Sequence, residues 1–244
     1  MTVALALPTR KSEEFRYADL NALAALWPLA EPEGVRVAAG ESFHRAVVQD
    51  AGGVVRLCLD LAAGASAAVH VLNAGGAYGR VELDVTLHRG ASFTLGAVQL
   101  GGGEQTLEVV ATVRHLEPDA ISRQMVRSVL AGHATGTCLG RIAVAKGAVG
   151  TDAEQSVRAM LLDRTATANA KPELEIFADD VKCAHGCAVG ELDAMGLFYL
   201  QSRGLTPALA KTLMLQAFIA EAFVGAEDEE RLQALALERL GGLV

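Results

Sequence analysis

The chain has 244 residues, a formal net charge of −8 at pH 7, 51% hydrophobic residues and only 5% aromatic residues. A chain of this length forms one large or two small domains and buries roughly 70% of its unfolded surface without needing disulfides. The net negative charge argues against a nucleic-acid partner, because nucleic-acid affinity comes largely from Lys and Arg side chains that neutralise phosphates. The abundance of Ala, Val and Leu favours thin, regular packing layers and therefore a repetitive architecture.

The sequence gives no signal for export or for insertion into a membrane. The N-terminal run MTVALALPTRK has no leading positive region and no A-x-A-like cleavage site. No apolar run reaches the length of about 18 residues that a membrane span needs. The four cysteines, Cys58, Cys138, Cys183 and Cys187, do not form a dense disulfide framework. We therefore expect free thiols, a cytoplasmic location and no membrane partner.

A short N-terminal segment, residues 1–34, precedes a long region of alternating apolar and polar residues, 35–191. Residues 81–87 are an example, because every second side chain there is apolar. This alternation is typical of half-buried strands. The region is therefore predicted to be made of short strands.

Small-residue corners separate these strands at recurring intervals. The corner glycines Gly40, Gly64, Gly90 and Gly147 lie 24, 26 and 57 residues apart, and residues 118–120 occupy the longest gap. An interval of 57 is close to two further turns of the same size. Repeats of this length indicate a solenoid, in which each coil covers the apolar face of the previous one. A β-sandwich, whose turns also recur at short intervals, is the alternative.

The motif KCAHGC, residues 182–187, brings three soft-metal ligand types close together. On an extended strand Cys183, His185 and Cys187 point to one face, with about 7 Å between successive Cα atoms. This spacing is too wide for all three to bind one metal unaided, and a zinc site would need a fourth ligand. A site shared across a subunit interface and a buried thiol pair in the last coil both fit the motif.

The sequence becomes helical in character in residues 192–244. Thr206 and Pro207 provide a helix cap and a proline at the first helical position. Residues with helical spacing follow up to Gly225, and the predicted buried face consists of Leu209, Leu213, Gln216, Ala217, Ala220 and Phe223. A second helix is predicted over residues 226–240, with an acidic first turn. These helices could cap the solenoid, dock a partner, or do both.

Several common signatures are missing from the sequence. It contains no P-loop, no dinucleotide-binding G-x-G-x-x-G before a helix, no G-x-S-x-G elbow and no recognisable flavin motif. Five histidines have no partner at ligand spacing and are assigned no role: His44, His70, His88, His115 and His133. These observations favour a protein that is not itself an ATPase, a dehydrogenase or a serine hydrolase.

The stretch KPELEIFADDVKCAHG, residues 171–186, closely resembles the signature of the SufB/SufD family, in its SufD form. The resemblance continues through residues 189–193 and 197–205. Near the other end, LPTRKSEEFRYADL, residues 7–20, is similar to the N-terminal motif of the same family. The similarity therefore touches both ends of the chain.

This resemblance implies a right-handed parallel β-helix flanked by helices. It also implies a scaffold subunit of the SufBCD complex, which assembles nascent iron-sulfur clusters. In that family SufD pairs with SufB through the β-helix ends, supports iron acquisition, and binds the ATPase SufC through its C-terminal helices. Longer relatives carry a helical N-terminal region that the short segment before the repeat does not match.

Carried over by position, Cys183 and His185 match the family's cysteine and histidine at the SufB interface. The resemblance thus implies that they are candidate shared ligands of iron or of a transient cluster, bound only in the complex and not tightly by the isolated chain. Cys187 stands where relatives commonly have another residue, and is either an added ligand or an incidental small residue. Without its partner the chain is expected to form a homodimer through the same end.

Two other functions fit the residues. One is an enzyme that uses Cys183 as nucleophile and His185 as base, although no acidic residue is clearly placed to orient the imidazole. The other is a purely structural solenoid adaptor, in which His185 would contribute only to stability. Replacement of His185 and thiol reactivity separate these alternatives from the scaffold.

Overall fold

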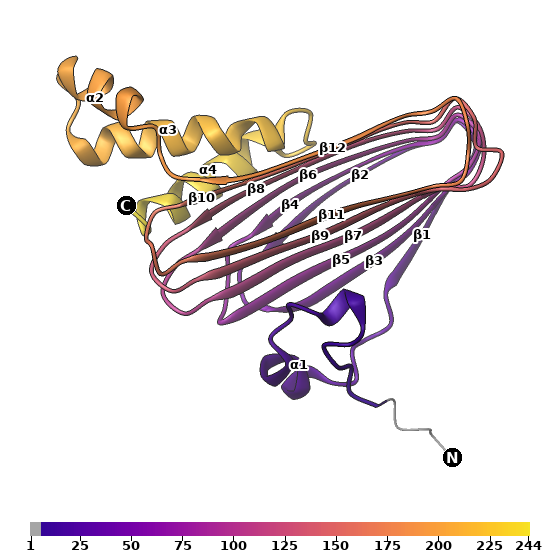
Figure 1. Ribbon diagram of the computed structural model, residues 1–244, viewed down its shortest axis with the longest axis horizontal. Coiled ribbons are helices and arrows are strands. Elements are labelled where there is room, and N and C mark those ends of the chain that lie inside the picture. The colour runs from indigo at the N-terminus through magenta and orange to yellow at the C-terminus, as the bar shows by residue number, and fades with distance from the viewer. Residues whose placement is uncertain (1–5) are drawn as a thin grey trace.

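The computed structural model describes residues 6–244, and its strands are stacked in two parallel sheets (Figure 1). The first five residues, part of the N-terminal run in which no export signal is predicted, lie outside the described part. Sheet A contains six strands: β1 (Glu33–Val37), β3 (Gly53–Leu61), β5 (Tyr78–Leu87), β7 (Thr106–His115), β9 (Thr135–Val144) and β11 (Thr167–Ile176). Sheet B contains β2 (Ser42–Gln49), β4 (Ser66–Asn73), β6 (Ser92–Gly101), β8 (Ile121–Leu130), β10 (Asp152–Leu161) and β12 (Lys182–Gly190).

Successive strands of the chain alternate between the two sheets, so that each pair of strands forms one coil. All pairings within the sheets are parallel. This confirms the predicted solenoid and excludes the β-sandwich, whose sheets are antiparallel. The strands extend from Glu33 to Gly190, close to the predicted limits of residues 35 and 191.

The first coils are shorter than the later ones. Register partners at the start of the sheet B strands are 24, 26, 29, 31 and 30 residues apart: Ser42, Ser66, Ser92, Ile121, Asp152 and Lys182. The 57-residue gap between corner glycines does contain two coils, as predicted. At the corner inside that gap Asp119 takes the place of the glycine, with a positive φ of 64°, and Asp180 does so in the last coil with φ 53°. Asp tolerates this left-handed conformation better than most residues do.

The space between the sheets is filled by small and branched apolar side chains. Val69, Val85, Leu95 and Val113, for example, are each no more than 1% exposed and belong to one continuous core. The inward positions alternate with outward ones along each strand, which is why the two-residue period was readable in the sequence. Figure 1 shows the sheets meeting at a tight corner on the right and diverging to the left.

The N-terminal segment lies against the outer face of sheet A. It contains a short 3-10 helix, η1 (Glu13–Phe15), and a helix, α1 (Leu20–Leu26), that the sequence did not predict. Asp19 caps α1 by accepting hydrogen bonds from the backbone N–H groups of Asn21 and Ala22, each 3.0 Å long.

A buried arginine holds this segment in place. Arg80 pairs with Glu108 and with Glu82, donates to the carbonyl of Glu14 at 3.0 Å, and has its guanidinium carbon 4.7 Å from the centre of the Phe15 ring. The backbone N–H of Asp19 donates to Glu108 at 3.3 Å. The N-terminal motif therefore has a structural role, because its residues complete a buried ion-pair network on sheet A.

The C-terminal region covers part of the outer face of sheet B (Figure 1). It consists of α2 (Ala194–Ser202), α3 (Pro207–Ala220), the 3-10 turn η2 (Glu221–Phe223) and α4 (Glu229–Gly241). Apolar side chains of α3, η2 and α4 pack on outward residues of β4, β6 and β8 to form a second core: Leu72, Val98, Val129, Leu215, Ile219, Phe223, Leu232, Ala236 and Leu240. The helices thus cover a face of the solenoid and leave its last coil uncovered.

The predicted cap of α3 is confirmed, but most of its predicted buried face is wrong. Of that face only Phe223, which follows the helix in η2, is fully buried. The Thr206 hydroxyl accepts from the backbone N–H of Leu209 at 3.3 Å, with Pro207 at the first helical position. Leu209 and Leu213 are 50% and 42% exposed, whereas Leu215 is fully buried. The error arose because apolar residues surround most of this helix, so spacing alone does not select the face that packs. Within residues 6–244 no helix is both long and apolar enough to cross a membrane.

Candidate functional site

Cys183, His185 and Cys187 all lie on β12, the strand at the open edge of sheet B. They are in register with Ala153, Gln155 and Val157 of β10. Val157 belongs to the core between the sheets, so the three ligand-type side chains lie on the interior side of the sheet. In the last coil that interior is open, because no further coil stacks on it: Cys183 is half-buried, and His185 and Cys187 are exposed.

The edge of β12 offers free backbone groups to another strand. The N–H of Lys182 donates to the carbonyl of Thr151 at 2.8 Å. Since N–H and C=O groups alternate in direction along a parallel strand, those of Cys183, His185 and Cys187 point away from β10 toward the open edge. The residues with ligand chemistry are thus also those whose backbone groups remain available.

The corresponding edge of sheet A is less able to pair. The N–H groups of Thr167 and Phe177 donate to the carbonyls of Ala134, just before β9, and of Val144 in β9, each at 2.9 Å. The backbone N–H and C=O groups of the even-numbered residues of β11 therefore face the open edge. Pro172 is one of them, and proline has no N–H to offer. Proline on an edge strand is a common way to prevent uncontrolled strand pairing. Of the two edges at this end, β12 is therefore the better one for a partner.

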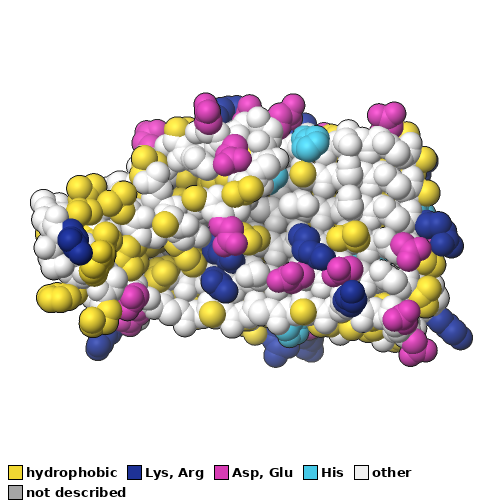
Figure 2. Space-filling view, turned by 90° about the horizontal axis from the view of Figure 1, so that it is seen from above, with side chains coloured by type: hydrophobic (Ala, Val, Ile, Leu, Met, Phe, Trp, Pro, Cys, Tyr) yellow, Lys and Arg dark blue, Asp and Glu magenta, His cyan; other side chains and the backbone are white. Residues whose placement is uncertain are grey.

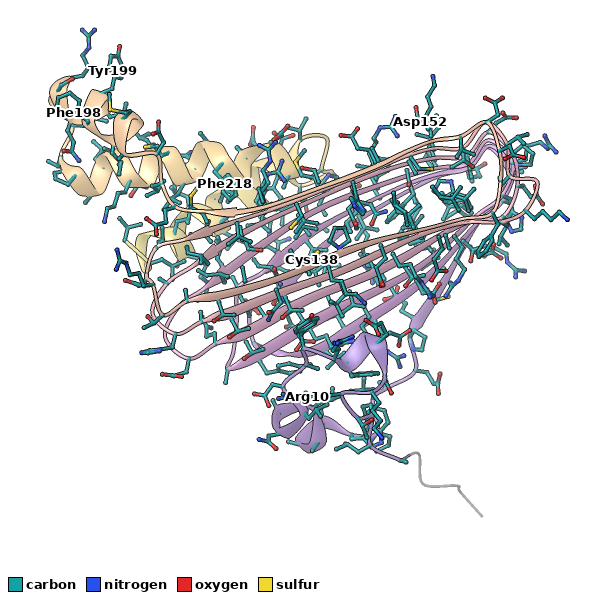
Figure 3. The ribbon with its side chains drawn as sticks, viewed as in Figure 1. Arg10, Cys138, Asp152, Phe198, Tyr199 and Phe218 are labelled. Carbon is teal, nitrogen blue, oxygen red and sulfur yellow. The ribbon has the colours of Figure 1, made fainter. Side chains whose placement is uncertain are left out.

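Thiols surround this open interior at different depths. Cys138 on β9 is 4% exposed and lies between the two sheets (Figure 3). Burial raises the pKa of the Cys138 thiol to about 12, with a smaller contribution from Cys187. Burial also raises the pKa of Cys183, and the negative charge of Asp152 adds to this effect. Both thiols are therefore protonated at neutral pH unless a metal or another cation displaces the proton.

The layer beneath His185 is polar. Gln155 and, one coil deeper, Gln124 are 2% and 3% exposed, and the Gln155 amide donates to the Gln124 carbonyl oxygen at 3.3 Å. The sequence did not mark these glutamines as functional, because each follows the strand alternation like an ordinary inward residue. In the described residues 6–244, no group of three His, Cys, Asp or Glu side chains is arranged to hold a metal ion.

A second unusual surface lies on α2 and the first half of α3. Its large apolar side chains are exposed: Met195 (71%), Phe198 (66%), Tyr199 (56%), Leu209 (50%) and Leu213 (42%). Figure 3 shows Phe198 and Tyr199 at the tip of α2, away from the sheets. In Figure 2 hydrophobic side chains gather over the same end of the molecule. We call this group the α2 surface.

Comparison with known proteins identifies the family. Residues 46–218 match the core domain of SufBD proteins, described as the SUF system for FeS cluster assembly. The chain belongs to the SufBD family. The matched range begins within β2 and ends within α3, so it includes β12 with Cys183 and His185, and the exposed residues of the α2 surface.

Several SufBD relatives are similar to this chain. The iron-sulfur cluster assembly protein SufD of Escherichia coli is 31% identical over 182 residues, which are 74% of this chain and 43% of the relative. A SufBD family protein of Synechocystis is 33% identical over 62% of this chain and 33% of its own length. Protein ABCI7, chloroplastic, of Arabidopsis thaliana is 38% identical over 48% of this chain and 25% of its own length. The chain thus spans less than half the length of these relatives.

Proposed function

We propose that the chain is a scaffold subunit of an iron-sulfur cluster assembly complex, without turnover of its own. The observation that carries this proposal is the row of Cys183, His185 and Cys187 on the unpaired edge of the last coil. Ligand side chains and free backbone groups occur there together, which is the arrangement that a site shared between two chains requires.

The partner at this edge is a SufB-like chain, paired with β12. Exposed strand edges associate readily with other strands, and a β-helix end also offers an open apolar interior. Ala168, Ala170 and Leu174 of β11 are only half-buried there and would be covered by the partner's last coil. This pairing would make one continuous sheet across the two subunits.

Iron or a nascent cluster is the cargo of this interface. Cys183 and His185 supply sulfur and nitrogen, which suit iron and iron-sulfur clusters. Their Cα atoms are about 7 Å apart along the strand, so side chains of the partner must complete the coordination. Cys187 lies two residues further along the same face and is available as an additional ligand. The isolated chain is expected to retain neither iron nor a cluster tightly.

A scaffold fits the thiol chemistry better than a cysteine-dependent enzyme does. An activated nucleophile has a thiol pKa below the usual value of about 8.5, whereas burial raises the pKa of Cys183. We expect Cys183 to react with alkylating reagents only at alkaline pH in the metal-free protein. Rapid alkylation near pH 6 would instead support the enzyme.

The α2 surface is proposed as the docking site of a SufC-like ATPase. Patches of large exposed apolar side chains on a folded chain mark interaction sites, and aromatic residues such as Phe198 and Tyr199 often dominate binding energy. This surface and the β12 edge belong to different elements, so both partners could bind at once.

The first test is anaerobic iron and sulfide analysis of the chain purified alone and with its SufB-like and SufC-like partners. The wild-type complex should hold iron and sulfide, and His185→Ala should lose most of both. His133→Ala is the control, because His133 is an exposed histidine at the corner between β8 and β9. Equal loading of the His185→Ala complex would favour the purely structural adaptor.

The second test separates the two partner surfaces. Phe198→Ser should abolish co-purification of the SufC-like subunit while pairing with the SufB-like chain persists. Phe177→Ser is a matched control, since Phe177 is 70% exposed but lies at the opposite corner of the solenoid. Loss of the ATPase subunit in both variants, or in neither, would argue against docking at the α2 surface.

The third test concerns the chain without partners. A free β12 edge should pair with the same edge of a second copy, so light scattering should detect a homodimer that a SufB-like chain displaces. Val189→Pro would remove one N–H from the free edge and should shift the isolated chain to monomer. A dimer that persists in this variant would place the contact elsewhere.

A further inference from the structure

A column of side chains runs through the interior and ends at His185. Leu95, Gln124, Gln155 and His185 are successive register partners on β6, β8, β10 and β12. Neighbouring strands lie about 4.8 Å apart, so each of these side chains can contact the next. The column is apolar in the deep coil and polar toward the open end. The buried side-chain amides of Gln124 and Gln155 destabilise the fold unless their polar atoms form hydrogen bonds.

One acceptor of this column is unused. The amide nitrogen of Gln155, Nε2, donates to Oε1 of Gln124 at 3.3 Å, whereas Oε1 of Gln155 is buried and has no hydrogen-bond partner among the described residues. The nitrogen and oxygen of an amide point in different directions from its carbon. Since the nitrogen donates to Gln124 in the deeper coil, the oxygen is the amide atom left for a donor in the coil of His185.

The opposite sheet makes room for Gln155. A Cβ atom at Gly140 of β9 would lie 1.8 Å from Nε2 of Gln155 and 2.8 Å from its Oε1. The Gln155 side chain therefore crosses the interior and lies directly on the backbone of sheet A, where only glycine leaves space for it. This contact fixes the amide in place, so the unused oxygen has a defined position.

We propose that Gln155 is a positioning residue for His185. When a partner covers the open end, Oε1 of Gln155 accepts a hydrogen bond from one imidazole N–H of His185. The other ring nitrogen is then unprotonated and directed toward the interface, where it binds iron or the cluster. Histidine ligands are commonly oriented in this way by an acceptor on their second nitrogen. The inference rests on the proposed function, because it assumes that His185 is a ligand.

The test uses the purified complex with the SufB-like partner and Co²⁺ as a spectroscopic probe, titrated anaerobically and followed by its ligand-field absorption. Gln155→Leu should weaken Co²⁺ binding about 10- to 100-fold, the usual cost of losing such an acceptor. Gln124→Leu is the matched control: it also breaks the Gln124–Gln155 hydrogen bond but leaves the oxygen beside His185 in place. Gln155→Glu keeps an acceptor there and should restore most of the affinity.

Thermal unfolding of the same variants separates positioning from stability. Both leucine variants should shift the melting temperature by similar amounts, while only Gln155→Leu weakens Co²⁺ binding. Equal weakening in both would show that interior packing is responsible and would overturn the inference. If His185→Ala weakens binding but Gln155→Leu does not, the inference fails and the proposed function stands. If His185→Ala has no effect, both fail.

Discussion

The two outer faces of the solenoid are covered by different kinds of contact. On sheet A the N-terminal segment is held by a charged network around Arg80 and Glu108, both fully buried. On sheet B the C-terminal helices are held by apolar packing around Leu215 and Phe223. The solenoid therefore binds the short N-terminal segment through specific polar contacts and the longer C-terminal region through buried apolar area.

The two attachments contribute differently to stability and to specificity. Buried apolar area stabilises in proportion to its size and without directional demands. A buried ion pair gains little overall, because desolvation offsets the Coulomb attraction, but it penalises any arrangement that leaves one charge unpaired. The charged network thus fixes where the N-terminal segment binds, and the apolar core supplies most of the binding energy of the helices.

The largest effect is expected from breaking the apolar attachment. Phe223→Ala should lower the free energy of unfolding by about 3 to 5 kcal/mol, because it removes a fully buried aromatic ring and leaves a cavity. Urea unfolding followed by circular dichroism measures this loss. Phe198→Ala is the control: its ring is 66% exposed, so its effect should stay within about 0.5 kcal/mol. Similar losses in both variants would contradict the assignment of the second core.

The stability effects of substitutions at Glu108 and Arg80, in the charged network, should not be additive. Glu108→Leu leaves Arg80 buried without its closest carboxylate and should cost about 3 kcal/mol. Adding Arg80→Leu should recover part of that loss, because two apolar residues then replace the pair. A double variant as unstable as the sum of the single ones would show that the two side chains act independently. The exposed pair of Arg36 and Asp60 is the control, and Arg36→Ala should cost less than about 1 kcal/mol.

A histidine enclosed between the sheets should respond to acid. Burial lowers the pKa of His115 to about 4, and its Nε2 lies 3.0 Å from the Ser122 hydroxyl. Between about pH 6.5 and 4, His115 is protonated in the unfolded chain but neutral in the folded chain. The free energy of unfolding therefore falls as the pH falls through this window. Comparing urea unfolding at pH 7 and pH 5, the wild type should lose up to about 2 kcal/mol more than His115→Leu does. Equal losses would show that the site is hydrated.

The smallest effect is expected at the surface, with the opposite sign. His88 lies between two carboxylates, 3.2 Å from Glu117 and 3.0 Å from Asp60. The hydrogen bond to Glu117 outweighs desolvation and raises the pKa of His88, so its contribution is present below about pH 6.5 and is lost as the pH rises through the folded pKa. His88→Gln should therefore cost more at pH 6 than at pH 8, by less than about 1 kcal/mol. A larger loss of stability for His88→Gln at pH 8 than at pH 6 would contradict a raised pKa of His88.

Corner spacing in the sequence predicted the solenoid, with a β-sandwich as the alternative, and strand alternation predicted the common face of Cys183, His185 and Cys187. The common face follows from the two-residue period of a strand, which depends only on local backbone geometry. The helices α1 and α2 are short and were not predicted, and most of the predicted buried face of α3 was wrong because this helix is apolar around most of its surface. The burial of Arg80 was not predictable either, because Arg80 alternates with inward residues and so faces outward from the sheet.

The repeating strands, the family resemblance and the row of ligand-type residues could all be predicted from the sequence, because each depends on neighbouring positions of the chain. The tertiary structure was needed to show that this row lies at an uncovered edge, that Pro172 weakens pairing at the edge of sheet A beside it, and that Gln155 lies beneath His185. These features depend on which strands stack together and where the stack ends. They join residues about 30 positions apart, the length of one coil, across distances that local propensity does not encode.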